Sequence, residues 1–210
     1  PQTFANTLSK SIPLAFTGLA VAMASRAGML NIGAEGQLYA GAMAAALMGL
    51  LVQGLPRPIA MTACILAGIL AGMVVGAVPG YFRAKHDTSE VIVAIMLNYI
   101  VMLFTSFLAN GPFKSEGAVS QTELIAENAM LHKLLKNSQL TSALFLLVVA
   151  AVALYLFLWR SSLGFKIRAV GGNASAAVAA GINSGQLMIF SMAISGGIAA
   201  MAGVTEVMGK

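Results

Sequence analysis

Charged side chains are too rare in this chain for a soluble fold. Lys and Arg number 12 and Asp and Glu number 7 among 210 residues, so 9% of the chain is charged. Soluble globular proteins average about 25%. Hydrophobic residues make up 59% of the chain, and a soluble protein needs surface charge to remain dispersed. The composition therefore predicts a protein of the lipid bilayer.

The excess of basic residues does not indicate nucleic-acid binding. The formal net charge is +5, but Lys and Arg stand singly between apolar runs, whereas nucleic-acid binding needs them clustered on one face. A positive excess in a membrane protein is typical of cytoplasmic loops. Cys64 is the single cysteine, and His86 and His132 have no partner at ligand spacing. We therefore expect no disulfide framework and no metal site.

Six uncharged windows between the charges predict the membrane segments. They cover residues 11–25, 36–56, 58–82, 91–113, 137–159 and 169–205. About 20 apolar residues cross the hydrocarbon core, and each backbone polar group there must be satisfied within its own segment. The first window is short, and it spans only if residues 27–30 extend it or if it is half of a broken helix. We expect an all-α polytopic transmembrane helical bundle of about six segments, cut at both ends.

Four glycines in the third window are spaced by four residues, which places them on one stripe of the predicted helix. They are Gly68, Gly72, Gly76 and Gly80. Small residues on one stripe let another membrane helix approach closely. The stripe is interpreted as helix packing within one subunit, with a subunit interface as the alternative.

Polar residues also fall at membrane depth. Asn31, Glu35 and Gln37 stand in a glycine-rich stretch between two apolar segments, and Asn98 and Tyr99 lie midway through another. An ionisable residue in the membrane is a functional hypothesis by default, and Arg26 is the nearest candidate partner for Glu35. The alternatives are an interfacial turn with Glu35 in headgroup water, and an Asn98 that bonds neighbouring helices.

Two helix caps are predicted from residue types. Residues 87–90 fit a capping box with Asp87 as the cap and Glu90 three residues on. In the basic loop at 160–186, Asn173 is a good N-cap for the alanine-rich run 174–180, and Gly181 stands where a helix ends. The result is a short exposed helix that needs a docking partner.

The charges of the other long loop, 109–140, nearly cancel, and residues 123–135 within it are predicted to form an amphipathic surface helix.

The inventory of catalytic motifs is thin. The sequence has no Gly-x-x-x-x-Gly-Lys-Ser/Thr phosphate loop, no Gly-x-Ser-x-Gly and no His-Glu-x-x-His. No paired acids or Ser/His set fall within the predicted spans. We therefore expect a protein that is not an enzyme and does not itself hydrolyse ATP.

Several segments together resemble one family. They are NIGAEGQ at 31–37, EVIVAIMLNY at 90–99, GFKIRAVGGN at 164–173 and SGGIAAMAG at 195–203. These segments resemble the ABC-transporter permeases for nucleosides and simple sugars, a binding-protein-dependent group that includes ribose and branched-chain amino-acid permeases. The first two segments look most like the nucleoside branch.

The resemblance implies the permease subunit of an ATP-driven importer in the bacterial cytoplasmic (inner) membrane, which translocates a nucleoside or simple sugar. Its implied partners are a second permease subunit, an extracytoplasmic substrate-binding protein and a cytoplasmic ATP-binding subunit. The last of these would bind ATP and Mg, so no cofactor is expected in this chain. Residues 1–210 would form one incomplete permease domain. Basic residues alone divide six to six between the two faces; the resemblance makes 160–186 the cytoplasmic ATPase-docking loop and 109–140 extracytoplasmic.

The implied sites follow from the matched segments. The expected substrate pathway contains Asn31, Glu35, Gln37, Asn98 and Tyr99. The expected ATPase-docking residues are Gly164, Phe165, Arg168, Gly171, Asn173, Ala177 and Gly181. The docking loop departs from the family at Gly172 and Ala174, where an acidic residue and Pro are commoner. The alternatives are a non-transporting membrane scaffold, for which the glycine stripe would be the interface, and an ion-coupled secondary carrier.

Overall fold

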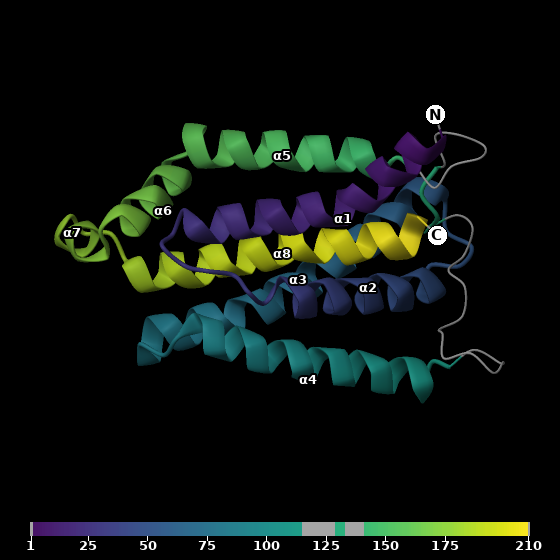
Figure 1. Ribbon diagram of the computed structural model, residues 1–210, viewed down its shortest axis with the longest axis horizontal. Helices are drawn as coiled ribbons and strands as arrows, with labels where there is room; N and C mark the ends of the chain where they lie inside the picture. Colours follow the sequence, from purple (N-terminus) through teal and green to yellow (C-terminus); the bar gives the residue numbers. More distant parts are fainter. Residues whose placement is uncertain (1, 115–128, 133–140, 210) are drawn as a thin grey trace.

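The computed structural model describes residues 2–114, 129–132 and 141–209, and the expected surface helix at 123–135 lies mostly outside them. Within the described ranges, the helices are α1 (Gln2–Ser25), α2 (Ala34–Leu51), α3 (Arg57–His86), α4 (Glu90–Asn110), α5 (Ala143–Arg160), α6 (Ser162–Gly172), α7 (Ala174–Ala179) and α8 (Ser184–Gly209). The long helices run along the longest axis of the molecule, and α6 and α7 lie at one end (Figure 1). The all-α class is confirmed.

Five of the described helices are long and apolar enough to cross a membrane: α1, α3, α4, α5 and α8. The first expected segment was short because Lys10 closes its window, but α1 continues through Lys10 to Gln2. Lys10 is exposed, and a lysine can keep its charged head in water while its stem lies along an apolar surface. The extension of α1 is therefore at its start, and the expected extension through residues 27–30 is wrong.

The second expected window, residues 36–56, corresponds to α2, which is not among these five helices. Its first turn holds Glu35 and Gln37, and it begins partway along the bundle (Figure 1). The connection at residues 26–33 runs inward from the end of α1 to reach it. Non-helical backbone at membrane depth is tolerated only where protein buries it or a cavity touches it. This connection is therefore the place where the fold needs buried hydrogen-bond partners.

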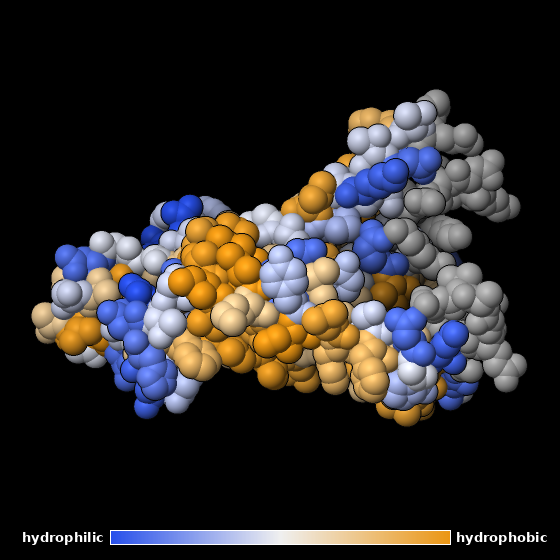
Figure 2. Space-filling model, turned by 60° about the horizontal axis from the view of Figure 1, so that its bottom comes forward, coloured by the Kyte–Doolittle hydropathy of each residue, from blue (hydrophilic) through white to orange (hydrophobic). Residues whose placement is uncertain are grey.

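The surface matches a membrane-spanning bundle. Figure 2 shows apolar side chains over the middle of the face in view, with hydrophilic side chains toward the two ends. The exposed apolar residues include Leu103 of α4, which is 71% exposed, and Val74 of α3. The hydrocarbon core of a bilayer contains no water, so a belt of exposed apolar side chains at this depth is suited to contact with lipid. The chain is a multi-pass membrane protein.

The glycine stripe of α3 faces α8, the central helix of the bundle. A Cβ added at Gly76 would lie 2.5 Å from the Met192 carbonyl oxygen, and one added at Gly72 would overlap the Gly196 carbonyl oxygen and the Ala200 side chain. Gly68 meets Val204 of α8 in the same way. The close approach needs residues without a Cβ on one helix and small residues on the other. The stripe is thus used within the chain.

The turn between α3 and α4 differs from its prediction. Asp87 does not cap α4; it ends α3 in the left-handed region with φ 49, and Ser89 stands at the N-cap of α4 without a side-chain bond. Because α3 continues to His86, Asp87 is taken up in ending that helix, and it pairs with Arg83 at 3.0 Å one turn back. Arg83 also lies 3.7 Å from the Glu90 carboxylate, which accepts a bond from the Leu30 N–H.

Candidate functional site

A buried amide network surrounds the α1–α2 connection. Asn31 and Gln37 are 1% and 0% exposed and bond to each other twice, because the Asn31 Nδ2 donates to Gln37 Oε1 at 2.8 Å and the Gln37 Nε2 donates to Asn31 Oδ1 at 3.0 Å. Asn31 also donates to Ser195 Oγ at 2.7 Å and accepts from the Gly33 N–H at 3.0 Å. Ser195 in turn donates to the Ala20 carbonyl oxygen of α1 at 2.6 Å. The network ties the connection to α8 and α1.

Asn98 completes this network from α4. Its Oδ1 accepts from the Gly36 N–H at 2.9 Å, and its Nδ2 donates to the Ile32 carbonyl oxygen at 3.2 Å. A Cβ added at Gly36 would lie 2.6 Å from that same Oδ1 and 2.9 Å from the Asn98 Cα. The first turn of α2 and the middle of α4 therefore touch at this point, and a buried side-chain amide supplies the bonds that an irregular backbone lacks.

The five expected pathway residues divide into two groups. Asn31, Gln37 and Asn98 are brought together and use their polar atoms on the protein, whereas Glu35 and Tyr99 are exposed. Arg26, the expected partner of Glu35, forms no ion pair with it among the described residues and lies instead near the Trp159 ring. Ser195 also belongs to the network, although it was not among the expected pathway residues. The spacing of Ser191 and Ser195 by one helical turn was the available signal.

A groove of about 340 Å³ lies between α2 and α4, beyond the contact of Gly36 with Asn98. Its walls are mixed apolar and hydroxyl-bearing, and they comprise Tyr39, Ala42, Met43, Ala46, Met102, Thr105, Ser106, Ala109 and Val207. Glu35 precedes Tyr39 by one turn of α2, and Tyr99 precedes Met102 by about one turn of α4, so both exposed residues continue the same stripes. Since α2 and α4 both run toward the end opposite α7 (Figure 1), the groove extends from mid-bundle toward that end.

The basic loop at 160–186 contains a helix that its sequence did not predict. Residues Ser162–Gly172 form α6, and Ser161 caps it by accepting from the Gly164 N–H at 2.9 Å. Gly164 packs directly on the carbonyl oxygens of Phe157 and Leu158 in α5, and Gly171 packs on that of Arg26. These two expected docking residues therefore fix the position of α6 against the bundle.

The short helix α7 forms where the residue types predicted it. It covers Ala174–Ala179, and the Asn173 Oδ1 accepts from the Ala176 N–H at 3.0 Å. Gly181 follows with φ +78, a conformation that favours glycine. Ala177 is buried, while Phe165 and Val178 are 62% and 55% exposed. Beside α7, a second groove of about 540 Å³ is lined by Leu163, Lys166, Gly181, Ile182, Asn183, Gln186, Leu187 and Phe190. This end therefore presents an uncovered, mixed apolar and basic surface.

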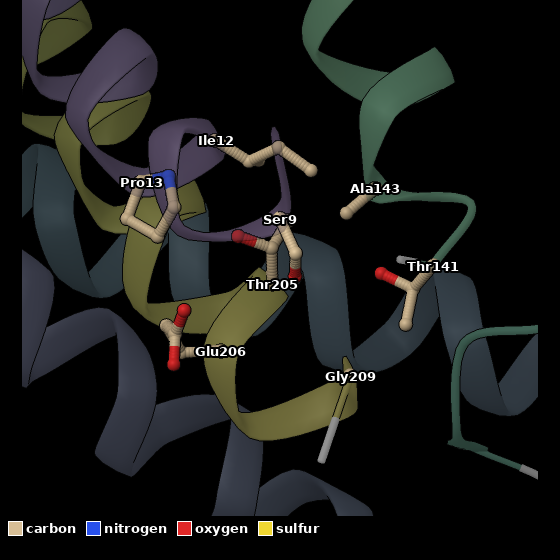
Figure 3. Close-up of a pocket in the computed structure, with 8 residues that line it drawn as sticks. All are labelled: Ser9, Ile12, Pro13, Thr141, Ala143, Thr205, Glu206 and Gly209. Atoms are coloured by element: carbon tan, nitrogen blue, oxygen red, sulfur yellow. The ribbon is translucent and has the colours of Figure 1, made fainter. Parts of the chain in front are cut away.

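The other end of the bundle holds a smaller cavity between α1, α8 and the start of α5 (Figure 3). Its volume of about 20 Å³ suits a single water. Its walls are formed by Ser9, Ile12, Pro13, Thr141, Ala143, Thr205, Glu206 and Gly209. Among the described residues, no group of three or more His, Cys, Asp or Glu side chains could hold a metal ion.

The chain matches a known protein family along almost its whole length. Residues 3–209 match the family described as "Branched-chain amino acid transport system / permease component". The chain is 34% identical to the nucleoside ABC transporter permease protein NupB of Lactococcus lactis subsp. cremoris (strain MG1363), over 97% of this chain and 58% of that protein. It is 34% identical to the guanosine ABC transporter permease protein NupP of Bacillus subtilis (strain 168), over 97% of this chain and 59% of that protein.

A relative named for a sugar matches nearly as well. The chain is 32% identical to the glucose ABC transporter permease protein TsgB13 of Haloferax volcanii, over 97% of this chain and 56% of that protein. The chain thus spans less than two thirds of the length of these relatives. No solved structure matches it significantly.

Proposed function

The chain belongs to the family of permease components of branched-chain amino acid transport systems, and from that premise we propose that it is the membrane-spanning permease of an ATP-driven nucleoside importer. The observation that carries the substrate class is the similarity, 34% in each case, to relatives named for a nucleoside and for guanosine. A simple sugar is the second candidate, favoured by the relative named for glucose. The proposed location is the bacterial cytoplasmic membrane.

The proposed substrate pathway follows the exposed face between α2 and α4. Substrate arrives at the end opposite α7 from an extracytoplasmic binding protein and moves along the 340 Å³ groove, a volume within the usual range of small-molecule sites. It reaches Glu35 and Tyr99 at mid-bundle, where α2 and α4 close together at Gly36 and Asn98. A second permease subunit covers the open side. Asn31, Gln37 and Asn98 contribute by holding the α1–α2 connection in place.

In this proposal, α6 and α7 transmit the free energy of ATP hydrolysis from the ATP-binding subunit to the permease. A cytoplasmic ATP-binding subunit docks on α7 and on the groove beside it, with Phe165, Asn173 and Val178 at the contact. ATP and Mg belong to that partner, and the permease supplies two conformations that bind the substrate with different affinities. Because Gly164 and Gly171 leave no space between α6 and the rest of the bundle, a displacement of α7 is transmitted to α5 and to the α1–α2 connection.

The pathway is tested by filling the groove. Replacing Ala42 with tryptophan should lower ATP-driven guanosine uptake by the reconstituted importer at least about tenfold. Ala42 lines the groove, and the large indole side chain would fill part of the space through which the substrate moves. The matched control is Ala153→Trp, since Ala153 is exposed on α5 away from the groove. Uptake is measured in proteoliposomes, with thermal stability in detergent checking that both variants fold. Undiminished uptake by a folded Ala42→Trp importer contradicts the pathway.

A further inference from the structure

Basic side chains gather where α5 meets α6, without acidic partners. Arg160 ends α5, Lys166 and Arg168 lie on α6, and Arg26 follows α1. Among the described residues none of these four forms an ion pair, since the pairs on this side of the bundle join Arg83 to Asp87 and to Glu90. Four cations with no counter-charge produce a local positive potential, which attracts an anionic ligand.

Two of these cations, Arg26 and Arg168, lie near the ring of Trp159. The Arg168 guanidinium carbon lies 4.1 Å from the centroid of the Trp159 ring, and that of Arg26 lies 6.0 Å from it. A guanidinium stacked on an aromatic face keeps its N–H groups free at its edge, where they match the geometry of phosphate. The Arg168 Nε is itself buried and has no hydrogen-bond partner among the described residues. Burial keeps that Nε from reaching a ligand, so a phosphate can meet only the terminal nitrogens of the guanidinium, to which the described residues offer no hydrogen bond.

An apolar ridge on α5 leads to this corner. Val148, Val152, Tyr155 and Trp159 recur every three or four residues, which places them on one face of the helix, and they are 54%, 52%, 60% and 48% exposed. In Figure 1, α5 lies at the outer edge of the bundle beside α1, and its last turn leads directly into α6. An apolar helix face that ends in tryptophan and cations has the order of a lipid: acyl chains first, then a charged headgroup.

We propose that this corner, formed by Arg26, Trp159, Arg160 and Arg168, binds the headgroup phosphate of an anionic phospholipid whose acyl chains lie along the α5 ridge. Basic pockets beside membrane helices recognise such headgroups through charge and hydrogen bonding. The lipid phosphate supplies the counter-charge that these cations lack among the described residues, and it fixes the junction of α5 with α6. This assigns Arg168 to the lipid boundary, and it goes beyond the transport function.

The test uses the fluorescence of Trp159 in the full-length permease reconstituted in phospholipid vesicles. The fluorescence of the Trp159→Phe variant is subtracted from that of the parent, so that the difference reports Trp159 alone. Quenching by acyl-brominated phosphatidylglycerol is compared with quenching by acyl-brominated phosphatidylcholine at equal mole fraction. The parent should prefer the anionic lipid. Arg26→Gln and Arg168→Gln should each reduce that preference about fivefold, since a basic residue near an anionic surface is worth about 1 kcal/mol. Arg168→Lys should retain only part of it, because lysine keeps the charge but not the stacked planar group.

Lys85→Gln serves as the matched control, because Lys85 is an exposed cation on the same end of the bundle, on α3; its preference should equal that of the parent. Equal quenching by the two lipids in the parent overturns the proposal, as does a preference that survives both arginine substitutions. Displacement of the anionic lipid by excess soluble glycerol phosphate points to a free-phosphate site instead. Loss of all lipid quenching when the ATP-binding subunit is present identifies that protein as the occupant and also overturns the proposal.

Discussion

Replacing Gly72 with leucine should abolish recovery of the folded permease. The added Cβ would overlap the Gly196 carbonyl oxygen and the Ala200 side chain of α8, and backbone on the facing helix cannot rotate aside as a flexible side chain can. Forcing extra atoms into a packed interior costs about 1–3 kcal/mol and occasionally more, and here the two helices must separate along the whole stripe. We expect loss of the monodisperse peak in size-exclusion chromatography and a loss of more than about 3 kcal/mol in stability.

The chain offers a matched control in Gly18→Leu. Gly18 also lies within a membrane helix, but a Cβ added there has nothing within 4 Å. The same substitution should therefore leave the chromatographic peak and the thermal midpoint near those of the parent. If Gly72→Leu and Gly18→Leu behave alike, the α3–α8 contact does not hold the bundle together.

Replacing Asn31 with alanine should destabilise the permease by about 2–4 kcal/mol and stop transport. The change removes four hydrogen bonds and leaves both polar atoms of the Gln37 amide and the Gly33 N–H without their partner. A buried polar group left unsatisfied costs about 1–3 kcal/mol, and lipid offers no water to replace the lost bonds. Thermal unfolding of the purified variant measures the loss, and uptake measures its consequence.

Asn110→Ala controls for the loss of an asparagine as such. Asn110 is exposed at the end of α4, and within the part of the chain that the structure describes its amide bonds only to Ser106 one turn back. Surface substitutions of this kind stay within about 0.5 kcal/mol. If Asn31→Ala is as stable as Asn110→Ala, the amide network does not support the α1–α2 connection.

Local chemistry was predictable from the sequence. Scarcity of charge required a membrane bundle, and the four-residue spacing of glycines in α3 required a close helix contact. Asn173 and Gly181 marked the ends of α7 correctly, because a cap depends on residues within a few positions of it. The start of α1 was misjudged because one charged residue was taken as the end of a membrane segment.

Long-range pairing was not predictable. Asn31 and Ser195 are 164 positions apart, so nothing in either segment indicated that the amides at membrane depth bond to one another rather than face a cavity. The turn at Asp87 had the residues of a capping box, but the extension of α3 through His86 decided its conformation. Arg168 carried a charge suited to docking, and only the folded chain reveals that the Trp159 ring lies against it.

The most direct test of the central claim is ATP-driven uptake by the complete importer, reconstituted in proteoliposomes with its ATP-binding subunit and its binding protein. Radiolabelled guanosine and glucose are compared at equal concentration, with and without ATP in the compartment of the ATP-binding subunit. A nucleoside importer should accumulate guanosine only when ATP is present, and other nucleosides but not excess glucose should compete with that accumulation. Glucose accumulation that nucleosides do not compete, or guanosine equilibration that is indifferent to ATP, would contradict this function.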